Sequence, residues 1–162
     1  MSGIDAIGLV YGYGQNEDGT IDEQTRERCI IAFRLYNRNR IHRIFITVSA
    51  SKNGKLMAEE MGSFFLACGV PSRDLRIDLR GGNTAGETDV CLTLAGTTPV
   101  IPISTWYHVP RIWWLWLCRG YITFPRASWK AAHWADLKIE PLKLLNALFR
   151  PRRSSKIIHG PK

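Results

Sequence analysis

Residues 104–111, Ser-Thr-Trp-Tyr-His-Val-Pro-Arg, carry the side chains best suited to bind an anion. The apolar run 99–103 before them is typical of a buried strand, and Pro110 favours the first turn of a helix, where no amide hydrogen is needed. His108 and Arg111 therefore lie where a strand ends and a helix begins, which is where open α/β sheets bind ligands. Arg111 would clamp an anion there, beside the positive end of the helix.

Polar and glycine residues follow the other predicted strands as well. Because the carboxyl ends of parallel strands meet at one edge, we expect a single site there. His108 is the candidate general acid or base, since the ordinary pKa of histidine lies near neutrality, and Glu87 would orient it. Arg28 and Arg111 would pair with the anion, and the amides of residues 12–15 would hold it. The predicted ligand-binding residues are Gly12, Gly14, Gln15, Arg28, Ser49, Asn83, Thr84, Ser104, Tyr107 and Arg111.

Each of these residues also has a purely structural interpretation. Thr84-x-x-Glu87 is a capping box that would do no more than start a helix. Arg28 could be a surface charge, and His108 a capping or packing residue. Gly12-x-Gly14 is only part of a dinucleotide-binding fingerprint, and the sequence holds no Walker A loop, so P-loop ATP hydrolysis is not expected.

Strand and helix patterns alternate along the chain, which predicts helices on both faces of a parallel sheet. We expect a three-layer α/β/α Rossmann-like fold with a mainly parallel sheet of about five strands in the order 3-2-1-4-5. A capping box at Thr20-x-x-Glu23 should open the first helix. The predicted strands are 4–11, 43–49, 75–79, 100–104 and 121–124, and the later helices are 57–68, 84–94, 109–118 and 141–149.

The length of 162 residues and the 45% hydrophobic content fit one domain, which we expect over residues 1–149. Residues 150–162 hold five basic residues and no acidic one, so this predicted flexible tail supplies most of the net charge of +8. A solvated tail is the simplest interpretation, with nucleic acid or anionic lipid as the alternative partner. The tail has no aromatic residue to stack on bases, so the nucleic-acid signal is weak.

Four well-separated cysteines fall on apolar helix faces and predict reduced core thiols in a cytoplasmic protein: Cys29, Cys68, Cys91 and Cys118. The sequence shows no cluster of metal-ligating residues, and it does not identify a cofactor. The sequence shows neither a signal peptide nor an apolar run long enough for a membrane span. Trp113 and Trp114 are adjacent, so one narrow helix face cannot bury both, and one of them should cover a second face or a partner or membrane surface.

Residues 100–111, Val-Ile-Pro-Ile-Ser-Thr-Trp-Tyr-His-Val-Pro-Arg, resemble the V-T-S-x-Y-H-M-P-R-A signature of the YdcF/SanA/ElyC-like domain family. Four other stretches, within roughly residues 4–125, are similar to further motifs of that family. They are Arg28-x-x-x-Ala32-x-x-Leu35-Tyr36, Ile46-Thr47-Val48-Ser49, Cys68-Gly69-Val70-Pro71 and Asn83-Thr84-Ala85-Gly86-Glu87.

The resemblance implies a Rossmann-like fold, a role in the cell envelope, and a polar pocket formed by Arg28, Asn83, Thr84, His108 and Arg111. Many members of the family carry an N-terminal membrane anchor, which this sequence does not show. Ser49-Ala50-Ser51 replaces the family's Ser-Gly-Gly, and Met57 stands where the family has an acid.

Three functions compete at this stage. The first is binding of a phosphorylated small molecule (a nucleotide, a nucleotide-sugar or a lipid-carrier phosphate), with phosphoester hydrolysis or transfer as the reaction to test. The second is a non-catalytic module for a nucleoside-type ligand such as S-adenosylmethionine. The third is docking to a membrane or a partner through the tryptophan-rich helix and the basic tail.

Overall fold

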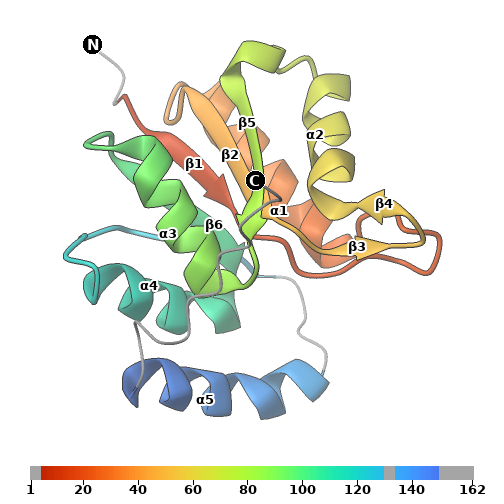
Figure 1. The fold of residues 1–162 in the computed structure, drawn as a ribbon. Coiled ribbons are helices and arrows are strands. Elements are labelled where there is room, and N and C mark those ends of the chain that lie inside the picture. The colour runs from red at the N-terminus through yellow and green to blue at the C-terminus, as the bar shows by residue number, and fades with distance from the viewer. Residues whose placement is uncertain (1–4, 130–133, 150–162) are drawn as a thin grey trace, which may run out of the picture.

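The computed structural model describes residues 5–129 and 134–149. Five parallel strands form the central sheet, in the order β5-β2-β1-β6-β7 (Figure 1). Counted along the chain within this sheet alone, that order is 3-2-1-4-5, as predicted. The strands are β1 (Ile7–Val10), β2 (Arg43–Val48), β5 (Leu75–Gly81), β6 (Val100–Thr105) and β7 (Arg126–Ser128).

Helices cover both faces of the sheet, which confirms the three-layer architecture. One face packs against α1 (Glu23–Asn37) and α2 (Met57–Ala67). The other packs against α3 (Thr84–Ala95) and α4 (Val109–Leu117). A fifth helix, α5 (Trp134–Phe149), contacts α4 and the short 3-10 helix η2 (Trp106–His108). None of the described helices combines the length and the apolar composition of a membrane span.

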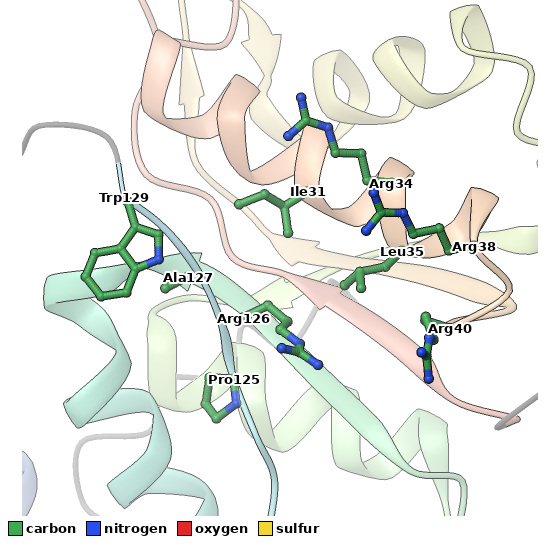
Figure 2. A pocket seen from close by; sticks show the side chains of 9 residues that line it. All are labelled: Ile31, Arg34, Leu35, Arg38, Arg40, Pro125, Arg126, Ala127 and Trp129. Carbon is green, nitrogen blue, oxygen red and sulfur yellow. The ribbon is translucent and has the colours of Figure 1, made fainter.

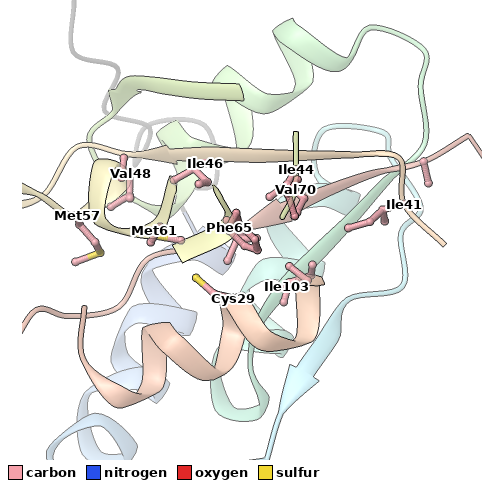
Figure 3. Close-up of a cluster of buried hydrophobic side chains, with 14 residues drawn as sticks. Cys29, Ile41, Ile44, Ile46, Val48, Met57, Met61, Phe65, Val70 and Ile103 are labelled. Atoms are coloured by element: carbon pink, nitrogen blue, oxygen red, sulfur yellow. The ribbon is translucent and has the colours of Figure 1, made fainter. Parts of the chain in front are cut away.

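The larger apolar core lies between the sheet and α1 and α2 (Figure 3). Cys29 of α1 and Met61 and Phe65 of α2 pack there against Ile46 and Ile103 of the sheet. All four cysteines are free thiols, as predicted, but only two are core residues. Cys29 and Cys91 are buried, whereas Cys68 and Cys118 are half-buried at the ends of α2 and α4.

The fifth strand begins later than predicted. Ile122 and Phe124 are about 80% exposed, so the apolar run 121–124 does not enter the sheet. This run leads back from the end of α4 alongside the first half of β6, and the hydroxyl of Thr123 donates to the carbonyl of Val100 at 2.6 Å. Pairing with β6 starts only at Arg126, opposite Ile103.

Both predicted capping boxes are wrong by one or two residues. The α1 cap is Asp22, whose carboxylate accepts the Thr25 amide at 2.8 Å, because the Thr20 hydroxyl is engaged with Asp18. The α3 cap is Asn83, whose side chain accepts the Gly86 amide. The Asp22 and Asn83 side chains thereby satisfy free amides of the first helical turn.

Two further elements differ from the prediction. Residues 51–56 form a hairpin, β3 (Ser51–Lys52) and β4 (Lys55–Leu56), rather than a plain loop. Asn53 and Gly54 at its turn have positive φ angles, the conformation that a tight hairpin turn requires. The last helix starts at residue 134 instead of Pro141, since an internal proline removes only one backbone hydrogen bond. The basic tail 150–162 lies outside the described residues.

Candidate functional site

The carboxyl end of the sheet brings together side chains from four helices. Arg28 comes from α1, Glu87 from the first turn of α3, His108 from η2, and Arg111 from the first turn of α4. Arg28, Glu87 and His108 are each less than 10% exposed. The α5 helix covers this group, which the sequence pattern does not predict.

Arg28 is buried and donates hydrogen bonds to three groups of the protein, so it is not a surface charge. Its Nη1 donates to the carbonyls of Tyr11 and Gly12 at 2.9 and 2.8 Å, and its Nη2 donates to the Thr105 hydroxyl at 2.9 Å. Its guanidinium carbon also lies 5.3 Å from the ring centroid of Tyr13. These bonds tie α1 to the ends of β1 and β6, so most of the guanidinium is committed to the fold. Burial lowers the pKa of Arg28 to about 10, and the group stays charged at neutral pH.

The amides of Tyr13 and Gly14, which follow β1, have partners within the protein. The amides of Tyr13 and Gly14 lie 3.2 and 3.1 Å from the Thr25 hydroxyl oxygen. A Cβ on Gly14 would lie 2.6 Å from the Asp22 carboxylate, and one on Gly12 would lie 2.5 Å from the Met57 sulfur. Both glycines therefore serve close packing of the protein against itself.

Arg111 has the bidentate geometry of an anion clamp, and a carboxylate of the protein occupies it. Its Nε and Nη2 donate to the two carboxylate oxygens of Glu140 in α5, at 3.2 and 3.3 Å. Its Nη2 also lies 2.9 Å from Nδ1 of His108. Lys143 Nζ lies 3.2 Å from the same carboxylate, whose side chain is only 7% exposed. This is the bidentate geometry by which arginine recognises carboxylates and phosphates.

The His108 ring is neutral. His108 Nδ1 lies 2.9 Å from Arg111 Nη2 and 3.3 Å from a Glu140 carboxylate oxygen. Because a guanidinium cannot accept a hydrogen bond, the shorter contact has Nδ1 accepting from Arg111, which places the ring proton on Nε2. Burial, with the charges of Arg28, Arg111 and Lys143, lowers the pKa of His108 to about 2. This low pKa argues against the premise that the histidine titrates near neutrality in the folded chain. At neutral pH His108 therefore acts as a buried N–H hydrogen-bond donor, and not as a group that gains and loses a proton.

Glu87 has the opposite character. Its carboxyl group is buried, and burial raises its pKa to about 8 despite the opposing charges of Arg28 and Arg111. The group is therefore largely protonated at neutral pH. A carboxylic acid that burial keeps protonated can act as a proton donor.

Unpaired polar atoms concentrate at this edge of the sheet. In residues 5–129 and 134–149, six buried side-chain nitrogen or oxygen atoms lack a hydrogen-bond partner. Only His42 Nδ1 lies elsewhere, and it is 2.8 Å from the Asp5 carboxylate. Leaving a buried polar atom unsatisfied costs about 1–3 kcal/mol, so these atoms require polar partners such as water or a ligand. The other five are Gln24 Nε2, Arg28 Nε, Glu87 Oε2, Ser104 Oγ and His108 Nε2.

The other predicted residues divide into two groups. Tyr107, whose hydroxyl donates to Gln24, lies in the cluster with Ser104. Ser49 and Gln15 have structural partners instead: the Ser49 hydroxyl donates to the Gly81 carbonyl at 2.9 Å, and the Gln15 amide bonds Gly19 and Lys55 backbone oxygens. The prediction that these two residues bind a ligand has no support in their contacts.

Asn83 and Thr84 line a small cavity next to the clamp. Its volume is about 120 Å³, and Arg111, Lys143 and Asn146 form its polar wall. This volume is below the roughly 300–1,000 Å³ of typical small-molecule pockets. A ligand larger than a phosphate group would therefore require α5 to shift.

Sequence reasoning missed the α5 contribution. The Tyr13 hydroxyl donates to Asp136, and Glu140 holds Arg111, so α5 docks through two acidic side chains one turn apart. The signal was present as Asp136-x-x-x-Glu140, but the helix had been predicted to start only at Pro141. In the described residues there is no group of three or more histidine, cysteine or acidic side chains that could hold a metal ion. Comparison with known proteins finds no matching family model, curated protein or solved structure.

Proposed function

We propose that this chain binds an anionic, phosphorylated small molecule at the carboxyl edge of the sheet. A nucleotide, a nucleotide-sugar and a lipid-carrier phosphate are the candidate ligands. The observation that carries the proposal is the cluster of five buried polar atoms without partners around the Arg111–His108 pair. Membership of the YdcF/SanA/ElyC-like family is part of the same proposal, and Arg28, His108 and Arg111 are among the residues on which that resemblance rests.

The Glu140 carboxylate supports the choice of an anion. It occupies Arg111 with both oxygens, as a phosphate would. In the proposed complex the ligand phosphate replaces this carboxylate, and α5 moves outward with Glu140. The released carboxylate remains close to Lys143, which offsets part of the cost of displacement.

Thermal unfolding in the presence of inorganic phosphate, AMP, ATP and UDP-glucose tests binding. We expect at least one of these probes to raise the melting temperature of the parent chain by several degrees. Arg111→Ala should abolish the shift, and Arg111→Lys should retain only part of it because the bidentate contact is lost. Arg73→Ala is the matched control, since the Arg73 side chain is 84% exposed and lies outside the cluster. Equal protection of the parent and Arg111→Ala chains by the same probe would refute the clamp.

The raised pKa of Glu87 favours a phosphoester hydrolysis or transfer step at the same site. In this step the ester P–O bond breaks and the leaving oxygen takes the Glu87 proton. A water molecule or an acceptor hydroxyl forms the new bond to phosphorus, and its proton passes to a non-bridging oxygen of the phosphate. Turnover of p-nitrophenyl phosphate and of a phosphodiester analogue tests it, with a large loss expected in Glu87→Gln. Ligand protection without turnover by the parent chain would leave a binding module of the nucleoside type.

A further inference from the structure

A second positively charged site lies along the boundary between α1 and β7. It is a groove of about 590 Å³, and none of its lining residues belongs to the buried cluster (Figure 2). Trp129 lies at one end and Arg40 at the other, with Arg126 between them. We call it the α1–β7 groove, lined by Ile31, Arg34, Leu35, Arg38, Arg40, Pro125, Arg126, Ala127 and Trp129.

The positive charge of this groove is not balanced by acidic side chains in its lining. All four of its arginines are exposed, and its lining contains no acidic residue. Within the described parts of the chain, no hydrogen bond or ion pair engages their guanidinium groups. Arg34 and Arg38 are one helical turn apart, a spacing at which like charges repel. Four unpaired guanidinium groups around one hollow form a binding surface for repeated negative charge.

An aromatic platform closes one end of the groove. The rings of Trp129 and Trp106 are parallel within 9°, with their centroids 6.4 Å apart. Trp129 is nevertheless 81% exposed, so most of its ring is accessible to a ligand. The platform continues into an apolar floor formed by Ile31, Leu35 and Pro125. A flat ring can stack on Trp129 while charged groups beside it reach the arginines.

We propose that the α1–β7 groove binds single-stranded nucleic acid, with phosphates on its arginines and a base on Trp129. The hollow shape favours a strand over a membrane, because an elongated groove with Trp129 at one end and Arg40 at the other can hold a strand along its length. The aromatic platform favours nucleotides over an acidic peptide. We expect binding with little sequence preference, because phosphate pairing with the arginines and stacking on Trp129 are open to every base.

Fluorescence anisotropy of a labelled 12-nucleotide oligo(dT) strand with the full chain at low salt tests the proposal. Arg34→Ala/Arg38→Ala should weaken binding at least tenfold. Trp129→Ala should weaken it about fivefold or more, the loss expected for one stacked base. The matched control is Arg73→Ala/Arg76→Ala, which removes two exposed arginines from the opposite, β5 side of the sheet. This control should change affinity less than twofold. The basic tail is present in every variant, so it does not contribute to the difference between them.

Several outcomes would overturn the proposal. An equal loss in the Arg73/Arg76 control would assign binding to net charge or to the tail. Full competition by ATP at similar phosphate concentration would indicate a mononucleotide site instead. Stronger competition by phosphatidylglycerol vesicles or by poly-glutamate than by unlabelled oligo(dT) would assign the groove to a membrane or a peptide. Arg111→Lys should leave oligo(dT) binding unchanged, so failure here and failure of the proposed phosphate site are distinguishable.

Discussion

Two arginine-rich regions of this chain share a helix but differ in how their charge is balanced. At the carboxyl edge of the sheet, Arg28 and Arg111 contact backbone carbonyls, a hydroxyl and the Glu140 carboxylate. In the α1–β7 groove, Arg34 and Arg38 face solvent. A buried charge must have a polar partner, whereas a surface charge is hydrated. A ligand must therefore displace protein groups at the first region and only water and ions at the second.

This contrast predicts the largest difference within α1 itself. Arg28→Met should lower the free energy of unfolding by about 3 kcal/mol, because it leaves the Tyr11 and Gly12 carbonyls without their donor. Arg34→Ala, six residues along the same helix, should change it by no more than about 0.5 kcal/mol. Urea unfolding of the two variants measures both values. Similar losses in both would contradict the division into a buried and a solvated region.

Glu140→Gln should separate stability from ligand affinity. The substitution removes the charge that balances Arg111 and should lower the free energy of unfolding by about 2 kcal/mol. The same change removes the competitor of the ligand phosphate. Affinity for the probe that protects the parent chain should therefore rise about tenfold, or about 1.4 kcal/mol, by calorimetric titration. A parallel fall in stability and affinity would mean that Glu140 only supports the fold.

His108 should make the folded chain sensitive to acid. Its folded pKa of about 2 lies below the unfolded value of 6.5, so the unfolded chain binds more protons between these two pH values. The contribution of His108 to stability should be fully present above pH 6.5 and should fall as the pH drops below it. Arg28, Arg111, Lys143 and Glu140 are the charged groups around the ring. His108→Gln should flatten this slope in melting curves recorded between pH 4.5 and 7, and an unchanged slope would refute the buried neutral ring.

Glu87 should give a slope of the opposite sign. Its folded pKa of about 8 lies above the unfolded value of 4.5, so the folded chain binds more protons between these limits. Its contribution to stability should be fully present below pH 4.5 and lost as the pH rises toward 8. Glu87→Gln, which cannot ionise, should be more stable relative to the parent at pH 8 than at pH 5. The reverse order would place an ionised carboxylate at this position.

Salt should distinguish the two regions by a smaller but continuous effect. Each phosphate neutralised on a single strand contributes a slope of about −0.7 in log K against log salt concentration. Binding of oligo(dT) in the groove should show a slope of about −2 to −3, and Arg126→Ala should reduce its magnitude by about 0.7. Phosphate binding at Arg111 should depend on salt more weakly, since buried pairs are screened less. Titrations between 50 and 200 mM salt measure both slopes.

Much of the fold could be predicted because its signals are local. The apolar runs of β1, β2 and β6 and the periodic helices between them placed the parallel sheet and its strand order. The start of β7 could not be predicted, since register with β6 depends on how far residues 121–125 must travel from the end of α4. The helix caps lie one or two residues from the predicted threonines, because the Asp22 and Asn83 side chains accept the amides of Thr25 and Gly86.

The position of the candidate site could be predicted from the sequence, but the groups that pair with its arginines could not. His108 and Arg111 lie where the pattern placed them, at the end of a strand and the start of a helix. The burial of Arg28 and the pairing of Arg111 with Glu140 depend on tertiary contacts over 17 and 29 residues, which no local pattern encodes. The α1–β7 groove could not be predicted for the same reason, because only the tertiary fold brings Arg126 of β7 to the same groove as Arg34 and Arg38.

The side-chain Nε–Hε resonance of Arg111 reports most directly on the proposed ligand site. It can be assigned in a ¹⁵N spectrum of the full chain by its loss in Arg111→Lys, and followed as inorganic phosphate or a protecting nucleotide is added. We predict a saturable shift as this N–H leaves the Glu140 carboxylate for phosphate, while the exposed Arg73 resonance does not move. An Arg111 resonance that stays in place while a ligand demonstrably binds the chain would contradict the account.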